Sequence, residues 1–60
     1  MSKRFILDYA ETPFQWVTIA ECDNDKQLQR YLNEEKSRFP HMKYRLIDTE
    51  SFKYLYQDVV

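Results

Sequence analysis

Apolar and polar side chains alternate along two stretches of the chain, residues 3–10 and 42–48, and this period of two predicts β-strands. The apolar residues that share a face in these stretches are Phe5, Leu7, Tyr9, Met42, Tyr44 and Leu46. A strand with one strongly apolar face must bury that face against another element. The pattern therefore predicts a sheet that is covered on one side.

Residues 14–22 are rich in β-branched and aromatic residues, which indicates another strand. Both of its faces carry apolar groups. Regular alternation places Trp16 and Ala20 on one face, and Val17 and Ile19 on the other. A proline just before this stretch interrupts the pattern, so we expect a hairpin with a loop of about three to five residues.

A helical period follows between residues 25 and 39. The residues that share this face are Leu28, Tyr31, Leu32, Glu35 and Phe39. Glu35 is the polar exception among them. Asn24 can cap the helix, with Gln27 three residues later as a capping-box partner. Pro40 prevents continuation, so the sequence predicts a helix that ends near residue 39.

The segment 52–58 fits two structures. Phe52, Tyr54 and Tyr56 alternate as in a strand. A helical stripe through Phe52, Leu55, Tyr56 and Val59 also fits, and Thr49 could cap such a helix. We favour a strand because phenylalanine, tyrosine and valine prefer pleated surfaces.

These elements predict a single α+β domain spanning residues 1–60. The order β-β-α-β, with a fourth strand if the last segment is extended, gives a small antiparallel sheet of three or four strands. We expect the first strand to be central, with the second and third antiparallel on either side. One amphipathic helix covers one face of such a sheet and leaves the other face open. The residues expected on the open face are Arg4, Ile6, Asp8, Lys43, Arg45 and Ile47.

Ten of the sixty residues are aromatic and none is glycine. A chain this short has little interior, so some of these rings should lie on the surface. Nine lysine and arginine residues face ten aspartate and glutamate residues, and no strong overall field draws the chain toward nucleic acid or a membrane. We expect a cytoplasmic protein, because the sequence shows neither a membrane-spanning run nor a secretory signal.

The composition offers little for catalysis. Cys22 and His41 are the only candidate nucleophile–base pair, and we expect them at opposite ends of the helix. A domain this small seldom contains a cleft of several hundred cubic ångströms. We therefore expect Glu34 to be solvated and Glu35 to pair with neighbouring cations. The chain is predicted not to be an enzyme, and to hold neither metal nor cofactor.

Binding to another protein needs no such chemistry, and tryptophan, tyrosine and arginine are the residues that most often anchor interfaces. We predict a small module that binds another protein, or a second copy of itself, by steric contact without catalysis. The candidate contact residues are Arg4, Trp16, Lys43, Arg45, Tyr54 and Tyr56. The alternative is a module for single-stranded nucleic acid, in which cations hold the backbone and rings stack on bases. That alternative predicts salt-sensitive binding that is lost on Arg45→Glu.

A hairpin, one helix ending near Phe39 and Pro40, and then the segment 44–48 (Tyr-Arg-Leu-Ile-Asp) resembles a layout of many short uncharacterised bacterial and bacteriophage proteins. The resemblance covers most of the chain and concerns layout, not a functional signature. It implies an accessory factor or inhibitor that binds a host protein. Those proteins often have a glycine in the turn after the final aspartate, whereas this chain has Thr49 and Glu50 there.

Overall fold

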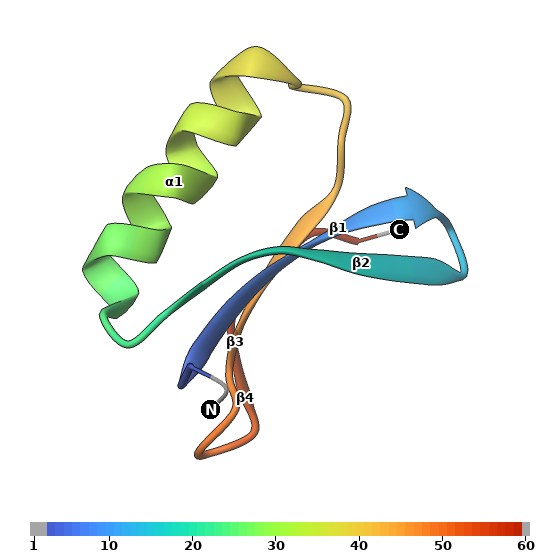
Figure 1. The fold of residues 1–60 in the computed structure, drawn as a ribbon. Coiled ribbons are helices and arrows are strands. Elements are labelled where there is room, and N and C mark those ends of the chain that lie inside the picture. Colours follow the sequence, from blue (N-terminus) through green and yellow to red (C-terminus); the bar gives the residue numbers. More distant parts are fainter. Residues whose placement is uncertain (1–2, 60) are drawn as a thin grey trace.

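The computed structural model describes residues 3–59, which form four β-strands and one α-helix (Figure 1). The elements are β1 (Phe5–Thr12), β2 (Gln15–Cys22), α1 (Asp25–Arg38), β3 (Tyr44–Asp48) and β4 (Lys53–Gln57). All paired strands are antiparallel, in the order β2-β1-β3-β4. The predicted α+β class, the central first strand and the strand at the end of the chain are confirmed.

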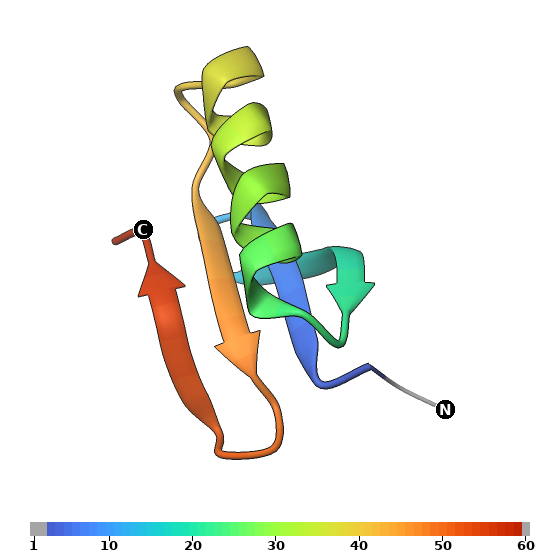
Figure 2. The ribbon, with the colours of Figure 1, turned by 90° about the vertical axis from the view of Figure 1, so that its left-hand side faces the viewer.

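The helix lies along one side of the sheet (Figure 2). It packs against β1, β2 and β3. Within residues 3–59 there is no second helix to cover the opposite side. The sheet therefore has a helix face and an open face, as the sequence predicts.

The core between the two layers is small. Its buried apolar residues are Phe5, Leu7, Leu28, Leu32, Tyr44 and Leu46. Only Leu28 and Leu32, one turn apart, come from the helix. Tyr31 and Phe39, which the helical period assigns to the same apolar face, remain 39% and 51% exposed. Figure 1 shows the reason, since the C-terminal half of α1 diverges from β2.

A β-bulge in β2 corrects the expected division of its faces. Leu7 pairs with Ala20, but Asp8 pairs with Thr18, so Ile19 is an extra residue on β2. Directly paired residues of antiparallel strands point to the same face. Ala20 therefore lies on the helix face with its partner Leu7, whereas Trp16 lies on the open face. The expectation that Trp16 and Ala20 share a face was wrong because it assumed an uninterrupted period of two.

The start of α1 is capped as predicted, though not by a capping box. The Asn24 side chain accepts a hydrogen bond from the Lys26 amide. Gln27 does not return a bond to the Asn24 amide, which instead donates to the Cys22 sulfur at 3.4 Å. Gln27 Oε1 accepts a bond from Cys22 Sγ at 2.9 Å. The end of β2 is thus linked to the first turn of the helix.

Both hairpin turns are tight although the chain has no glycine. Only Pro13 and Phe14 separate β1 from β2, which is shorter than the expected three to five residues. In the β3–β4 turn, Phe52 adopts a φ of 57°, a region that glycine enters far more easily. A left-handed conformation costs a non-glycine residue roughly 1–2 kcal/mol. The surrounding turn must supply contacts that hold Phe52 in this conformation.

Asp48 supplies such contacts. Its carboxylate accepts hydrogen bonds from the amides of Glu50 and Ser51 and from both Nε and Nη2 of Arg4, the last two at 3.0 and 2.9 Å. The Arg4 guanidinium is the main reason that the pKa of Asp48 lies far below its usual range. Arg4 therefore joins the N-terminus of β1 to the β3–β4 turn.

This arrangement predicts acid-sensitive stability. Because the pKa of Asp48 is lower in the folded than in the unfolded chain, its ionised form stabilises the fold above the unfolded value of about 3.9. That contribution decreases as the pH falls below about 5. We expect Asp48→Asn to lower the melting temperature at pH 7 and to flatten its decrease between pH 5 and 3, as measured by circular dichroism.

Glu50→Gln is the matched control for this prediction. Glu50 also pairs with Arg4 Nε, at 3.4 Å, but its side chain is 73% exposed. An exposed ion pair contributes little. The Glu50 variant should keep the acid dependence of the parent protein. An unchanged slope in the Asp48 variant would show that this carboxylate is not the titrating group.

Candidate functional site

The open face of the sheet carries a continuous group of aromatic, charged and aliphatic side chains. The strand register fixes which residues belong to it, since paired residues share a face. The pairs on this face are Ile6 with Glu21 and Ile47, Asp8 with Thr18 and Arg45, Ala10 with Trp16, and Ile47 with Tyr54. Among these, Trp16, Arg45 and Tyr54 are candidate contact residues from the sequence. They come from β2, β3 and β4.

Arg45 is held in place by a buried carboxylate. Its Nε donates a hydrogen bond to Asp8 Oδ2 at 2.8 Å, and Thr18 Oγ1 donates to Asp8 Oδ1 at 2.7 Å. The Asp8 side chain is only 4% exposed, and that of Arg45 is 23% exposed. A buried carboxylate needs both a cation and hydrogen bonds to offset its loss of hydration. Asp8 has both, so it fixes the direction of the arginine side chain.

Two aromatic rings flank the same guanidinium. Its central carbon lies 4.4 Å from the centroid of the Trp16 ring and 5.9 Å from that of Tyr54. Both distances allow cation–π attraction, which favours tryptophan. Trp16 is half-buried and Tyr54 is 54% exposed. We call Asp8, Trp16, Thr18, Arg45 and Tyr54 the open-face cluster.

The structure separates Arg4 from Trp16 and pairs it with a different carboxylate. Arg4 precedes β1 and is engaged with Asp48, whereas Trp16 pairs with Ala10 six residues along the same strand. Six residues of extended chain span about 20 Å. Lys43 is exposed. It lies nearer to Trp16 than Arg4 does, because its carbonyl oxygen accepts a hydrogen bond from the amide of Ala10, the residue that pairs with Trp16.

Tyr56 lies on the helix face, which corrects its placement beside Tyr54. A bulge in β4 causes this change, since Leu46 pairs with Tyr56 while Ile47 pairs with Tyr54. The Tyr56 hydroxyl donates a hydrogen bond to Asp58 and accepts one from Lys36 Nζ. Lys36 also pairs with Asp58 at 2.9 Å. Tyr56 therefore helps to attach β4 to α1 and lies outside the open-face cluster.

Asp8 and Thr18 are members of the cluster that the sequence did not identify as functional. Asp8 is the only charged residue in the segment 5–10, which is otherwise apolar or aromatic. This position is the signal in the sequence that could have identified it. A charged residue in such a position is usually paired. The identity of its partner depends on the register between β1 and β3, which the sequence does not specify.

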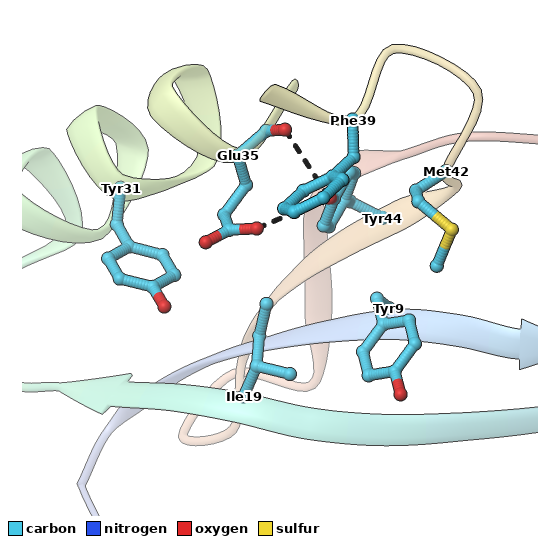
Figure 3. Close-up of a pocket in the computed structure, with 7 residues that line it drawn as sticks. All are labelled: Tyr9, Ile19, Tyr31, Glu35, Phe39, Met42 and Tyr44. Atoms are coloured by element: carbon cyan, nitrogen blue, oxygen red, sulfur yellow. Dashed lines mark hydrogen bonds between the residues drawn. The ribbon is translucent and has the colours of Figure 1, made fainter. Parts of the chain in front are cut away.

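A groove of about 330 Å³ opens on the other side of the sheet, between the C-terminal half of α1 and the strands (Figure 3). Its lining residues are Tyr9, Ile19, Tyr31, Glu35, Phe39, Met42 and Tyr44. Divergence of the helix from β2 creates the space, since the bulky side chains there do not meet across it.

The residues that could serve catalysis lie apart in the structure. Cys22 precedes α1 and His41 follows it, and a helix of fourteen residues separates its ends by about 20 Å. Within residues 3–59 no three histidine, cysteine, aspartate or glutamate side chains are grouped where they could hold a metal ion. In the same residues no helix has the length and apolar character needed to cross a membrane. The absence of catalysis, metal and cofactor remains a prediction.

Comparison of the chain with protein-family models, with curated proteins and with solved structures gave no match.

Proposed function

We propose that this chain is a protein-binding module that docks a partner on the open face of its sheet and catalyses no reaction. The observation that carries the proposal is the position of Arg45, fixed by buried Asp8 beside the rings of Trp16 and Tyr54. Tryptophan, tyrosine and arginine are the residues most enriched among interface hot spots.

The rigidity of the cluster supports this proposal. Ordering a flexible side chain at an interface costs about 0.5–1.5 kcal/mol. The charged end of Arg45 is already fixed by a hydrogen bond and by contact with Trp16 before a partner arrives. Ile6 and Ile47 are paired, half-buried and on the same face, and they add apolar area. A partner thus meets a preorganised surface.

The same geometry disfavours the nucleic-acid alternative. A phosphate that approached Arg45 would compete with Asp8, which already compensates its charge. A base stacking on Trp16 would have to share that ring with the guanidinium 4.4 Å away. The formal net charge of −1 gives no general attraction to a polyanion.

Binding of this kind acts by steric occlusion or by scaffolding. A role as a bacteriophage-encoded modulator of a host protein is a finer form of the same proposal. It is supported by the resemblance in layout described above. A homodimer is a competing occupant of the open face, and light scattering at two protein concentrations distinguishes it from binding to a different protein.

The test uses the double variant Trp16→Ala/Tyr54→Ala. We expect this variant to remain folded by circular dichroism and to lose at least about thirtyfold in affinity for the partner, since each hot spot is worth 2 kcal/mol or more. The partner is captured from a cytosolic extract, identified by mass spectrometry, purified and measured by calorimetry.

Phe14→Ala is the matched control, because Phe14 is an aromatic residue that is 96% exposed in the β1–β2 turn, outside the open-face cluster. It should bind like the parent protein. Equal binding by the double variant and the parent would overturn the proposal. Salt-sensitive binding to a mixed-sequence single-stranded oligonucleotide, abolished in the double variant, would favour the nucleic-acid alternative instead.

A further inference from the structure

The groove between α1 and the strands is lined by an unusual proportion of aromatic residues. Four of its seven lining residues are Tyr9, Tyr31, Phe39 and Tyr44. Figure 3 shows them on several sides of one space, with rings supplied by the helix, by the segment after it and by the strands. The faces of aromatic rings carry negative electrostatic potential and attract cations. Tyr44 is buried, so the rings that an occupant of the groove can reach are those of Tyr9, Tyr31 and Phe39. A space bordered by these three rings favours a positively charged guest.

Among the described residues 3–59, Glu35 is the only charged residue that lines this groove. It lies one turn from Tyr31 and one turn from Phe39 on the same side of α1, and its carboxylate points into the space (Figure 3). None of the ion pairs formed within residues 3–59 includes Glu35. The expectation that Glu35 pairs with a neighbouring cation was therefore wrong. A half-buried carboxylate without a cation has lost part of its hydration and has no opposite charge that offsets the loss.

Tyr44 gives the Glu35 carboxylate only a weak hydrogen bond. The Tyr44 hydroxyl lies 3.5 Å from both the carbonyl oxygen and Oε2 of Glu35, a distance typical of weak hydrogen bonds. Burial and the charge of Glu35 both raise the pKa of this hydroxyl. The Glu35 carboxylate thus places negative charge inside the groove, and it can still accept a stronger hydrogen bond or pair with a cation.

Lys36, the residue after Glu35, forms its ion pair elsewhere. Lys36 Nζ lies 6.0 Å from the centroid of the Tyr44 ring, but it pairs with Asp58 at 2.9 Å and donates a hydrogen bond to Tyr56. The hydrogen bonds to Tyr56 and Asp58 raise the pKa of Lys36, so the lysine stays charged in this ion pair. Lys36 is not among the residues that line the groove, so it leaves the aromatic space open to a cation from solution.

We propose that this groove binds a small organic cation that carries a methylated ammonium group. A quaternary ammonium spreads its charge over methyl groups, so it loses less hydration on entering an apolar site than a compact ion does. Aromatic rings together with a carboxylate recognise such groups in general. The volume, at the lower end of the range for ligand sites, suits a small molecule. This site lies on the helix face and is independent of the open face.

Choline is the probe, and 3,3-dimethylbutan-1-ol is its neutral counterpart of nearly the same shape. In a titration of the full chain followed by amide NMR shifts, choline should cause saturable shifts at Tyr31, Glu35, Phe39 and Met42. Sodium chloride at equal ionic strength controls for salt. The alcohol should bind at least about tenfold more weakly, because it lacks the charge that the rings and the carboxylate attract.

Glu35→Gln should weaken choline binding by about tenfold or more, whereas Glu34→Gln, one residue earlier and exposed, should not change it. Tyr31→Leu keeps an apolar side chain without a ring and should also weaken binding. Equal affinity for choline and the alcohol would overturn the proposal and leave a merely apolar groove. So would the absence of saturable shifts, or equal effects of the two glutamate substitutions.

Discussion

Leu7→Ala is expected to destabilise the protein by about 2–5 kcal/mol, which is comparable with the whole stability of a domain of this size. Leu7 is fully buried in the central strand, where it pairs with Ala20 on one side and Leu46 on the other. The cavity left by its truncation would lie between α1 and the sheet. The helix could fill it only by moving toward the sheet, which would disturb the remaining core contacts. Urea denaturation followed by circular dichroism should show a large decrease in the midpoint or an unfolded chain.

Phe14→Ala is the control for this prediction, since it removes a larger side chain that is almost entirely exposed. Substitutions of this kind usually change stability by less than about 0.5 kcal/mol. Similar midpoints for the two variants would mean that the interface between α1 and the sheet does not carry the stability of the fold.

The helix could be predicted from the sequence because its signals are local. Asn24 lies just before the first turn, and Pro40 follows the last one. Leu28 and Leu32 are one turn apart, and they are the two helical residues that become buried. Each of these signals acts within a few residues of the chain, so no knowledge of the rest of the fold is needed.

The β-bulges could not be predicted from alternation alone. A bulge adds one residue to a strand and reverses the faces of all later residues. Ile19 beside Ala20, and Leu55 beside Tyr56, are the positions where this happens. Adjacent apolar residues cannot both face the core in a regular strand, whereas a bulge allows it. Such pairs are a signal for a bulge, but only the partner strand determines whether one forms.

The residue types of the open-face cluster were predictable, and its arrangement was not. Trp16, Arg45 and Tyr54 are anchor residues by type and lie on three different strands. Their convergence depends on the pairing of Asp8 with both Thr18 and Arg45, which is set by contacts between distant segments. For the same reason the sequence marks Glu35 as a polar exception but gives no indication of the groove around it.

Arg45→Met is expected to destabilise the protein by about 2–4 kcal/mol, although the residue lies at the surface. The substitution leaves the Asp8 carboxylate buried without its cation, and breaking a buried pair in this way costs about 3–5 kcal/mol. The effect should fall somewhat lower because Arg45 retains some contact with water. Arg45→Glu should be still more harmful, because it places a second carboxylate beside Asp8. Loss of nucleic-acid binding in that variant would therefore not separate binding from folding.

The double variant Asp8→Asn/Arg45→Met removes the unpaired charge while keeping a hydrogen-bond partner for Thr18. It should recover most of the stability lost in Arg45→Met, so a double-mutant cycle measured by urea denaturation should show a coupling of about 1–3 kcal/mol. Additive effects of the two substitutions would contradict the geometry of the pair. Because we expect this variant to fold without the arginine, its affinity for the partner tests the role of Arg45 in docking. Binding as tight as that of the parent protein would mean that Arg45 serves the fold and that the rings alone make the contact.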